Sequence, residues 1–479
     1  MAVLGLDIGS SGAKGLVLND DGAIAAVSRV SYLPRHGDGG TVELDASLLA
    51  DRVAGLIEDA VAQSPSPIDA VAITSVGEAI VPVDQDGTPL APAMLTADTR
   101  LSGECRVWDE ADAALDFVDT TGLPLRDMWS VHAMRVHLRN TGISGRITGF
   151  CTLEEIVHRA LGVEPATALS QAARSGLLDR RKLAWSDSQA GVAGVDPSLL
   201  SRIALPGTEV GQLSTSRFGL PRGARVVSGG HDQYLASVGA GAGEHFPMWS
   251  SGTVESLTVV TPKASLREGV PTYPVDEDVW VSPVPNLNGG QVLFWLCGLL
   301  GRDDPGELLD AGPADDRDDT IFVPTLGTTG APDFDTAASG LIAGLTYRTD
   351  AGQLARAAVR GITHETRHAA SLLGRGVDFL DGFALAGGGS RSVYWNRMRA
   401  AAFGLPVTCR KHHDCAAIGA ALMAFRALGA DGVDLDRVNP VKEVIDPDAG
   451  DVAAFEKAHA RYLELRARTM AARCGSDIE

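Results

Sequence analysis

The chain contains the segment VLGLDIGSSGAKGLVL at residues 3–18, in which two apolar runs flank an acidic residue and a turn of glycine and serine. Val3–Leu6 has the composition of a strand, and Asp7 follows it directly. Gly15–Leu18 is a second apolar run, and Ile24–Val30 is a third. Consecutive strands joined by glycine-rich turns predict the antiparallel start of a sheet.

The pattern continues as an α/β unit and recurs weakly in the second half. Apolar residues at helical spacing predict a helix over Ala46–Gln63, and Ala70–Ser75 has the composition of a buried strand. Met248–Thr253 again ends in a small-residue turn before an apolar strand at Leu257–Val260. Later helices are predicted at Leu354–Leu373, Ser392–Phe403, Ala416–Leu428 and 451–472. The sequence therefore predicts two α/β halves, each beginning with a hairpin.

Length and composition restrict the class of protein. A chain of 479 residues exceeds what one core normally holds, so we expect domains at 1–242 and 243–479, with mixed helices and loops over 101–225. The formal net charge of −20 argues against nucleic acid as a partner. No apolar run approaches the ~20 residues of a membrane span. Scattered cysteines without a CxxC pair, and a start unlike a signal peptide, favour the cytoplasm.

The turn after the first strand has the chemistry of a phosphate site. Small residues allow backbone amides to approach phosphate oxygens, and Ser10 and Ser11 add hydroxyl donors. Asp7 is placed to hold Mg²⁺ through water, and Lys14 could supply a point charge. The alternative is an ordinary β-turn.

The sequence GGHDQ at residues 229–233 follows a short apolar strand. The two glycines leave room beside the strand end, so Asp232 is expected to project into a cleft. Phosphoryl transfer needs little covalent help, and one carboxylate that accepts the hydroxyl proton suffices. The alternatives are that Asp232 caps the helix Gln233–Gly239 and that His231 is a packed or orienting side chain.

A third glycine-rich segment, GGGSRS at residues 387–392, lies between the apolar strand Phe383–Ala386 and a helix. A strand, a glycine loop and a helix N-terminus together favour an anion or nucleotide site. The spacing matches neither a GxGxxG fingerprint nor a GxxxxGK[ST] loop. The alternative is a tight turn in which Ser392 caps the helix.

Further polar residues have an ambiguous role. Glu78 and the pair Asp98 and Arg100 could hold vicinal hydroxyls of a substrate, or form ordinary surface ion pairs. Cys409–Cys415 contains two histidines, but its spacing matches no common zinc pattern, so it is interpreted as a loop and a helix start.

Taken in order, these elements resemble the FGGY carbohydrate kinases, the family of glycerol kinase, xylulokinase and gluconokinase. The resemblance rests on Asp7–Lys14, Asp98–Arg100, Thr121–Pro124, Ser175–Asp179, Gly229–Gln233, Ser251–Thr253, Gly340–Leu345 and Gly387–Arg391. It implies two ribonuclease-H-like α/β domains with a catalytic cleft between them. It also implies transfer of a phosphoryl group from ATP, with Mg²⁺, to a hydroxyl of a small sugar, polyol or sugar acid.

The resemblance also assigns roles to residues. Asp232 is expected to be the general base, and Asp7 and Asp232 to associate with the metal. The residues expected at the substrate are Glu78, Arg100, Asp232 and Gln233. The residues expected at ATP are Ser10, Ser11, Lys14, Gly252, Thr253, Gly388, Gly389 and Asn396. A homodimer is common among relatives and is expected here. Thr96 and Met128 replace aromatic residues of relatives, so the sugar is not identified.

Two other classes of function fit parts of the pattern. One is an actin-like or chaperone-like ATPase module, against which Glu78, Arg100 and Gln233 argue. The other is a non-catalytic sugar-binding regulator derived from a kinase, against which the retained Asp7 and Asp232 argue.

Overall fold

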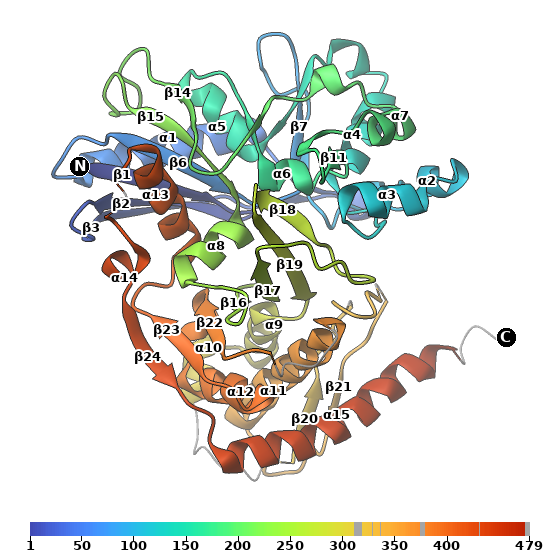
Figure 1. The fold of residues 1–479 in the computed structure, drawn as a ribbon. Coiled ribbons are helices and arrows are strands. Elements are labelled where there is room, and N and C mark those ends of the chain that lie inside the picture. Colours follow the sequence, from blue (N-terminus) through green and yellow to red (C-terminus); the bar gives the residue numbers. More distant parts are fainter. Residues whose placement is uncertain (311–318, 328, 336, 374–378, 431, 475–479) are drawn as a thin grey trace.

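The computed structural model describes all residues except 311–318, 328, 336, 374–378, 431 and 475–479. Its first half, blue to green in Figure 1, and its second half, yellow to red, form two α/β domains one above the other. No helix within the described ranges has both the length and the apolar character needed to cross a membrane.

A six-stranded sheet forms the centre of the first domain, in the order β14-β15-β6-β1-β2-β3. Its strands are β1 (Ala2–Ile8), β2 (Gly12–Asn19), β3 (Ile24–Ser31), β6 (Ala70–Ser75), β14 (Glu209–Gln212) and β15 (Arg225–His231). α1 (Ala46–Gln63) packs on this sheet through its apolar side, and Asp45 caps its start by accepting the backbone N–H groups of Ser47 and Leu48.

The strand register brings the predicted catalytic residues to one edge of this sheet. β1 and β15 both run parallel to β6, so Asp7 and Gly230 both pair with Thr74. The Thr74 hydroxyl donates a hydrogen bond of 2.6 Å to the Gly230 carbonyl. Asp232 follows β15 directly and therefore lies on the same edge of the sheet as the end of β1, with β6 between the two strands.

The segment between these strands forms a further layer of the first domain. Its five-stranded sheet has the order β4-β5-β8-β7-β9. The strands are β4 (Arg35–His36), β5 (Val42–Leu44), β7 (Ile80–Val83), β8 (Ala93–Met94) and β9 (Gly149–Thr152). The helices are α2 (Arg106–Glu110), α3 (Ala114–Thr121), α4 (Ser130–Arg139), α5 (Leu153–Leu161), α6 (Leu169–Ala173) and α7 (Asp187–Ala193). Short strands β10 (Thr167–Ala168) and β13 (Ile203–Ala204) pair, as do β11 (Leu178–Asp179) and β12 (Ala184–Trp185). The prediction of helices and loops over 101–225 missed these short strands.

The second domain repeats the topology of the first. Its sheet has the order β18-β19-β17-β16-β22-β23-β24. The strands are β16 (Met248–Ser251), β17 (Glu255–Thr261), β18 (Tyr273–Asp276), β19 (Val279–Asn286), β22 (Phe383–Ala386), β23 (Val407–Arg410) and β24 (Val441–Ile445). In both sheets three antiparallel strands are followed by two parallel ones, β3-β2-β1-β6-β15 in the first and β19-β17-β16-β22-β23 in the second. This repetition confirms the weak internal similarity predicted from the sequence.

Helices and one more strand pair complete the second domain. The helices are α9 (Gly290–Leu300), α10 (Pro305–Asp310), α11 (Ala351–Ala369), α12 (Val393–Phe403), α14 (Leu435–Val438) and α15 (Ala449–Cys474). β20 (Ile321–Val323) pairs with β21 (Leu341–Ala343). α15 runs along the lower edge of the molecule beside α11 and α12 (Figure 1).

Two helices cross where the domains meet. α8 (Asp232–Ala240) and α13 (Cys415–Ala427) pack backbone to backbone. A Cβ atom on Gly239 would lie 2.0 Å from the Cys415 carbonyl oxygen, and one on Gly419 would lie 2.0 Å from that of Leu235. Gly5 of β1 approaches the Ala417 carbonyl in the same way. α13 thus lies against the first sheet although it belongs to the second half of the chain, and the limits 1–242 and 243–479 stay a prediction.

Most predicted elements agree with the structure. The helix Ala46–Gln63 and the strands Ala70–Ser75 and Phe383–Ala386 have the predicted bounds. α12 begins at Val393 because Ser392 is its N-cap and accepts the Trp395 N–H. The predicted two-domain α/β fold is confirmed.

Candidate active site

Asp232 is the first residue of α8 and lies at the junction of the two domains. Its side chain retains 23% exposure, so it remains accessible. Loss of hydration raises the pKa of Asp232 to about 8, and the negative charge of Asp7 adds to this rise. A carboxyl with this pKa is largely protonated at neutral pH when no cation is bound, and it must be ionised to act as a general base.

Asp7 is the second carboxyl group of this site, and we call Asp7 and Asp232 the acidic pair. Burial raises the pKa of Asp7 to about 6, although Lys14 opposes the shift. Lys14 does not contact Asp7 by an ion pair. It pairs instead with Asp414, 3.1 Å away, just before α13. Asp414 also pairs with Arg29, so the two basic side chains connect the first sheet with the C-terminal half.

A hydrogen-bonded chain leads from Glu78 to Asp232. Arg174, just after α6, donates to Glu78 and, over 2.9 Å, to the Tyr273 hydroxyl. That hydroxyl lies 3.4 Å from His231 Nδ1. His231 Nε2 lies 3.2 Å from the Asp232 carboxylate. Tyr273 belongs to β18, so the second domain contributes to this chain.

The charges around this series of hydrogen bonds determine the protonation state of His231. Burial lowers the pKa of His231 well below its usual value, and the positive charge of Arg174 lowers it further. A neutral imidazole carries one N–H, and Nε2 faces the carboxyl group of Asp232, which only accepts when it is ionised. We therefore assign the proton to Nε2, which donates to Asp232, while Nδ1 accepts from Tyr273. This arrangement orients the Asp232 carboxylate.

The backbone before Glu78 is shaped by this cluster. A Cβ atom on Gly77 would lie 2.9 Å from the His231 ring and 3.0 Å from Arg174 Nε, so only glycine leaves room for both. Glu78 has a left-handed backbone with φ of 64°, which costs free energy and is often found at functional sites. Burial raises the pKa of Glu78, while Arg174 opposes the rise.

The first turn is open for a ligand. The Gly9 N–H donates to the Gly12 carbonyl at 2.9 Å and closes the turn. The hydroxyls of Ser10 and Ser11 make no hydrogen bond to any residue that the structure describes. They remain available as donors.

Gln233 and Arg100 differ in their relation to this cluster. Gln233 accepts a hydrogen bond of 3.2 Å from the Ser250 hydroxyl of β16, so it joins α8 to the second sheet. Arg100 donates to Asp98 and to Glu43, at 2.6 Å each for Nη2. Among the described residues, no hydrogen bond or ion pair joins Arg100 to the cluster around Asp232.

The second turn lies between β16 and β17. The Gly252 carbonyl accepts the Gly290 N–H at 2.9 Å, and the Thr253 carbonyl accepts the Gln291 N–H at 3.1 Å. The turn therefore rests on the start of α9. The turn at Gly252 and Thr253 is exposed, and its position corresponds to that of the first turn in the repeated topology.

A fully buried ion pair supports this second turn. Arg399 of α12 donates to Glu255 at 2.9 Å, and neither side chain has any exposure. Arg399 also donates to the Ser251 hydroxyl and, over 3.3 Å, to the Gly389 carbonyl. Thr366 of α11 donates to the other Glu255 oxygen at 2.6 Å. We name these five residues the Arg399 network. It joins the second turn to the glycine loop.

The third glycine segment is only partly available to a ligand. Gly388 is exposed, with open space around it. Asn396 is buried, and its amide nitrogen donates to the Ser390 carbonyl at 2.8 Å and to Cys409 Sγ at 3.3 Å. Its carbonyl oxygen accepts from Arg399. The Asn396 side chain therefore holds the loop in place, and contact with adenosine stays a prediction.

Comparison with known proteins agrees with this geometry. The N-terminal domain of the FGGY family of carbohydrate kinases matches residues 2–239, and the C-terminal domain of that family matches residues 248–428. The chain belongs to the FGGY family of carbohydrate kinases. The kinase is 22% identical to a gluconokinase of Bacillus subtilis (strain 168), with 92% of this chain and 90% of that protein covered. It is 26% identical to a glycerol kinase of Thermus brockianus, with 96% and 94% covered.

Solved structures share the fold of the kinase. A ligand-bound xylulose kinase of Lactobacillus acidophilus has a TM-score of 0.87 at 22% identity, with 98% of each chain covered. A gluconate kinase of the same organism has a TM-score of 0.86 at 22% identity, also with 98% of each chain covered. The predicted two-domain fold and the predicted carbohydrate kinase class are thereby confirmed.

Sequence reasoning missed two members of the cluster in this kinase. Arg174 follows the short helix α6 in the segment 101–225, where no motif marked it. Tyr273 lies far along the chain on an edge strand of the other sheet. No spacing in the sequence connects either residue with Asp232. The segment Cys409–Cys415, predicted to be a loop and a helix start, contains the last two residues of β23, then a loop, and then the first residue of α13. Among the described residues, no group of three or more metal-ligating side chains is found.

Proposed function

We propose that the kinase transfers the γ-phosphoryl group of ATP to a hydroxyl group of a small sugar or polyol, with Asp232 as general base. The observation that carries this proposal is the position of Asp232. Its carboxylate is accessible at the domain junction, is oriented by neutral His231, and has a pKa raised to about 8. In its ionised form, which a cation bound beside Asp7 would favour, this group can take the proton of a bound hydroxyl.

Different residues are proposed to act on the acceptor hydroxyl and on the phosphates of ATP. The substrate oxygen attacks the γ-phosphorus while its proton passes to Asp232, and the bond from the γ-phosphorus to the bridging oxygen of ATP breaks to release ADP. Most of the catalysis then lies in positioning and in electrostatic stabilisation. Ser10 and Ser11 of the first turn, with Lys14, and Gly252 and Thr253 of the second turn are proposed to bind the phosphates.

Mg²⁺ fits the acidic pair. It is usually held by one or two carboxylates together with water and substrate phosphates, so a third protein carboxylate is not required. The charge of Asp7 raises the proton affinity of Asp232, which is the situation that a bound cation relieves. We propose that these two residues hold the metal, which would neutralise charge on the phosphates.

The charge of the cluster favours an uncharged acceptor. Arg174 is already paired with Glu78, and Arg100 with Asp98 and Glu43. No cation of the described cluster is therefore left for a substrate carboxylate. Among the relatives, glycerol kinase and xylulose kinase are named for uncharged acceptors and gluconokinase for an acid. We propose a polyol or sugar whose hydroxyls bind Glu78, Arg174 and Gln233; a role for Arg100 stays a prediction.

The test is ADP release with magnesium-ATP across glycerol, tetritols, pentitols, ketopentoses, aldoses and aldonic acids. We expect an uncharged acceptor to give the highest rate. Asp232→Asn should lower that rate by about 10²-fold or more, the scale of a general base. Asp51→Asn, an exposed carboxylate on α1, is the matched control and should retain the wild-type rate.

The outcomes separate the parts of the proposal. Full activity of Asp232→Asn would rule out the base. An aldonic acid as the best acceptor would refute the charge argument and leave the base intact. Sugar binding without ADP release would instead support a non-catalytic regulator, and ATP turnover without any sugar would support an ATPase module. A cytoplasmic location and a homodimer stay predictions.

A further inference from the structure

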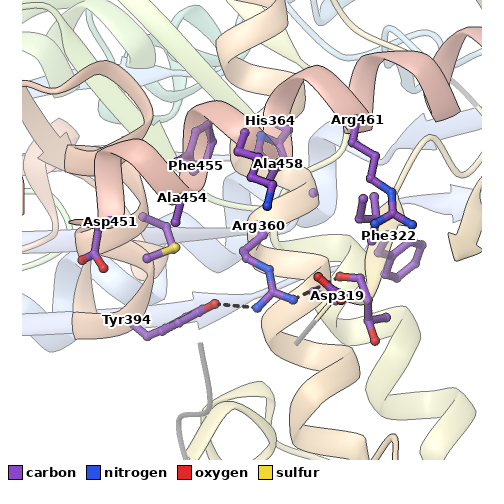
Figure 2. Close-up of a pocket in the computed structure, with 16 residues that line it drawn as sticks. Asp319, Phe322, Arg360, His364, Tyr394, Asp451, Ala454, Phe455, Ala458 and Arg461 are labelled. Carbon is purple, nitrogen blue, oxygen red and sulfur yellow. Dashed lines mark hydrogen bonds between the residues drawn. The ribbon is translucent and has the colours of Figure 1, made fainter. Parts of the chain in front are cut away.

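A second hollow lies in the C-terminal domain, between α11, α12, α15 and the start of β20. Its volume is about 380 Å³, within the range of small-molecule sites. Figure 2 shows its side chains converging from these elements. None of the residues that line it belongs to the Asp232 cluster or to the glycine turns. It is therefore separate from the candidate active site.

Basic side chains enter this hollow from two sides. Lys457 and Arg461 lie one turn apart on α15. Neither forms an ion pair or hydrogen bond with any residue that the structure describes. Arg360 approaches from α11, where it donates to the Tyr394 hydroxyl at 3.0 Å and to the Thr320 carbonyl at 3.1 Å (Figure 2). These two bonds fix the direction of its guanidinium.

Neither acidic residue that lines the hollow, Asp319 or Asp451, pairs with Lys457 or Arg461. Asp451 already accepts from Arg397 with both oxygens, at 2.8 and 3.0 Å. Asp319 is exposed, so water screens its charge. The chain as a whole has 61 acidic and 41 basic residues, so two neighbouring basic residues without an acidic partner among the described residues, Lys457 and Arg461, are contrary to its general composition. A cationic hollow in an acidic protein indicates an anionic ligand.

The walls suit a ligand larger than a simple ion. Phe322 and Phe455 contribute apolar surface, and small residues such as Ala357 and Ala458 keep the centre open. Burial lowers the pKa of His364 well below its usual value, so this ring is a neutral wall. The hollow thus combines basic groups with an apolar lining.

We propose that this hollow binds a small phosphate ester, held by Lys457 and Arg461 on one side and by Arg360 with Tyr394 on the other. A phosphate dianion presents three oxygens, enough to accept from two opposite sides. The apolar lining then contacts the organic part. This site does not depend on the proposed catalytic role of Asp232.

The experiment is calorimetric titration of the full chain with glycerol 3-phosphate, inorganic phosphate and glycerol. The double variant Lys457→Glu with Arg461→Glu reverses both exposed charges and leaves the active site unchanged. Arg468→Glu, also exposed on α15 and outside the hollow, is the matched control. We expect glycerol 3-phosphate to bind the double variant at least about tenfold more weakly than the wild type, or about 1.4 kcal/mol. Arg468→Glu should bind as the wild type does.

Any phosphate bound in the active site contributes equally to all of these proteins, so the difference between variants reports the hollow alone. Two gentler variants, Tyr394→Phe and Arg360→Lys, should each weaken binding while the thermal midpoint stays near that of the wild type. Equal affinity of wild type and double variant would overturn the proposal. An equal loss of affinity for glycerol and for glycerol 3-phosphate in the double variant would overturn it as well, since the basic groups would then have no specific role toward the phosphate.

Discussion

The Arg399 network allows a sharp prediction about stability. Arg399 and Glu255 are both fully buried, so removal of either partner leaves a charge without its counterion inside the protein. We consider Arg399→Met, Glu255→Gln and the double variant. Methionine keeps the volume of the arginine stem, and glutamine keeps the shape of the glutamate.

The magnitude follows from the burial. Breaking a buried ion pair by removing one partner destabilises a protein by about 3–5 kcal/mol, because the remaining charge is desolvated and unpaired. We expect Arg399→Met to lie at the upper end of this range, since it also removes the bonds to Ser251 and Gly389. The double variant carries no unpaired charge and should recover at least about 2 kcal/mol of the summed loss of the single variants.

The assay is urea unfolding followed by tryptophan fluorescence. Trp249 and Trp395 lie near the Arg399 guanidinium, with ring centroids 5.6 and 4.5 Å away, so they report on this region. Glu456→Gln is the matched control, because it breaks the half-exposed pair with Arg367 and should cost less than about 1 kcal/mol. Additive losses in the double variant, or single losses as small as that of the control, would refute the reasoning.

Two more predictions concern the cluster and the helix crossing. The pKa of Asp232 is raised from 3.8 to about 8 on folding, so this carboxyl contributes stability at pH 4 that is lost as the pH rises to about 8. The free energy of unfolding of Asp232→Asn, measured by urea unfolding without divalent metal, should therefore increase relative to that of the wild type over this interval. Parallel pH profiles of the two proteins would contradict this prediction. Gly419→Ala places a methyl group 2.0 Å from the Leu235 carbonyl oxygen and should destabilise by at least about 1–3 kcal/mol. A Cβ atom at Gly55 of α1 would lie in open space, so Gly55→Ala should stabilise the protein by about 0.5–1 kcal/mol. If the thermal midpoints of Gly419→Ala and Gly55→Ala shift in the same direction, this reasoning is wrong.

The elements that the sequence predicted well are those with a strong local pattern. Ala46–Gln63 has apolar residues on one helical side and an N-cap at Asp45, so its limits are encoded within the segment. Ala70–Ile73 is apolar because β6 is buried in the middle of the sheet. Asp7 and Asp232 were each recognisable at the end of an apolar segment beside glycines, but the register of β1, β6 and β15 is what brings them to one edge of the sheet.

The parts that escaped prediction depend on contacts between distant segments. Tyr273 contributes to the site from an edge strand of the second domain, and its sequence surroundings resemble any other strand. Arg174 is recognised as a site residue only once Glu78 and His231 are placed beside it. The family resemblance assigns Asn396 to the ATP site. Its burial and its hydrogen bond to Cys409, however, result from the packing of α12 against β23. A local pattern contains no record of such partners.

The crossing of α8 and α13 has a consequence for motion. When side chains of two helices interlock, they must leave their grooves before one helix rotates over the other. At Gly239 and Gly419 no side chains stand between the helices, so a rotation there meets little resistance. Asp232 begins one helix and Asp414 precedes the other. The axis for closing the two domains around a substrate is therefore expected to pass through these two glycines.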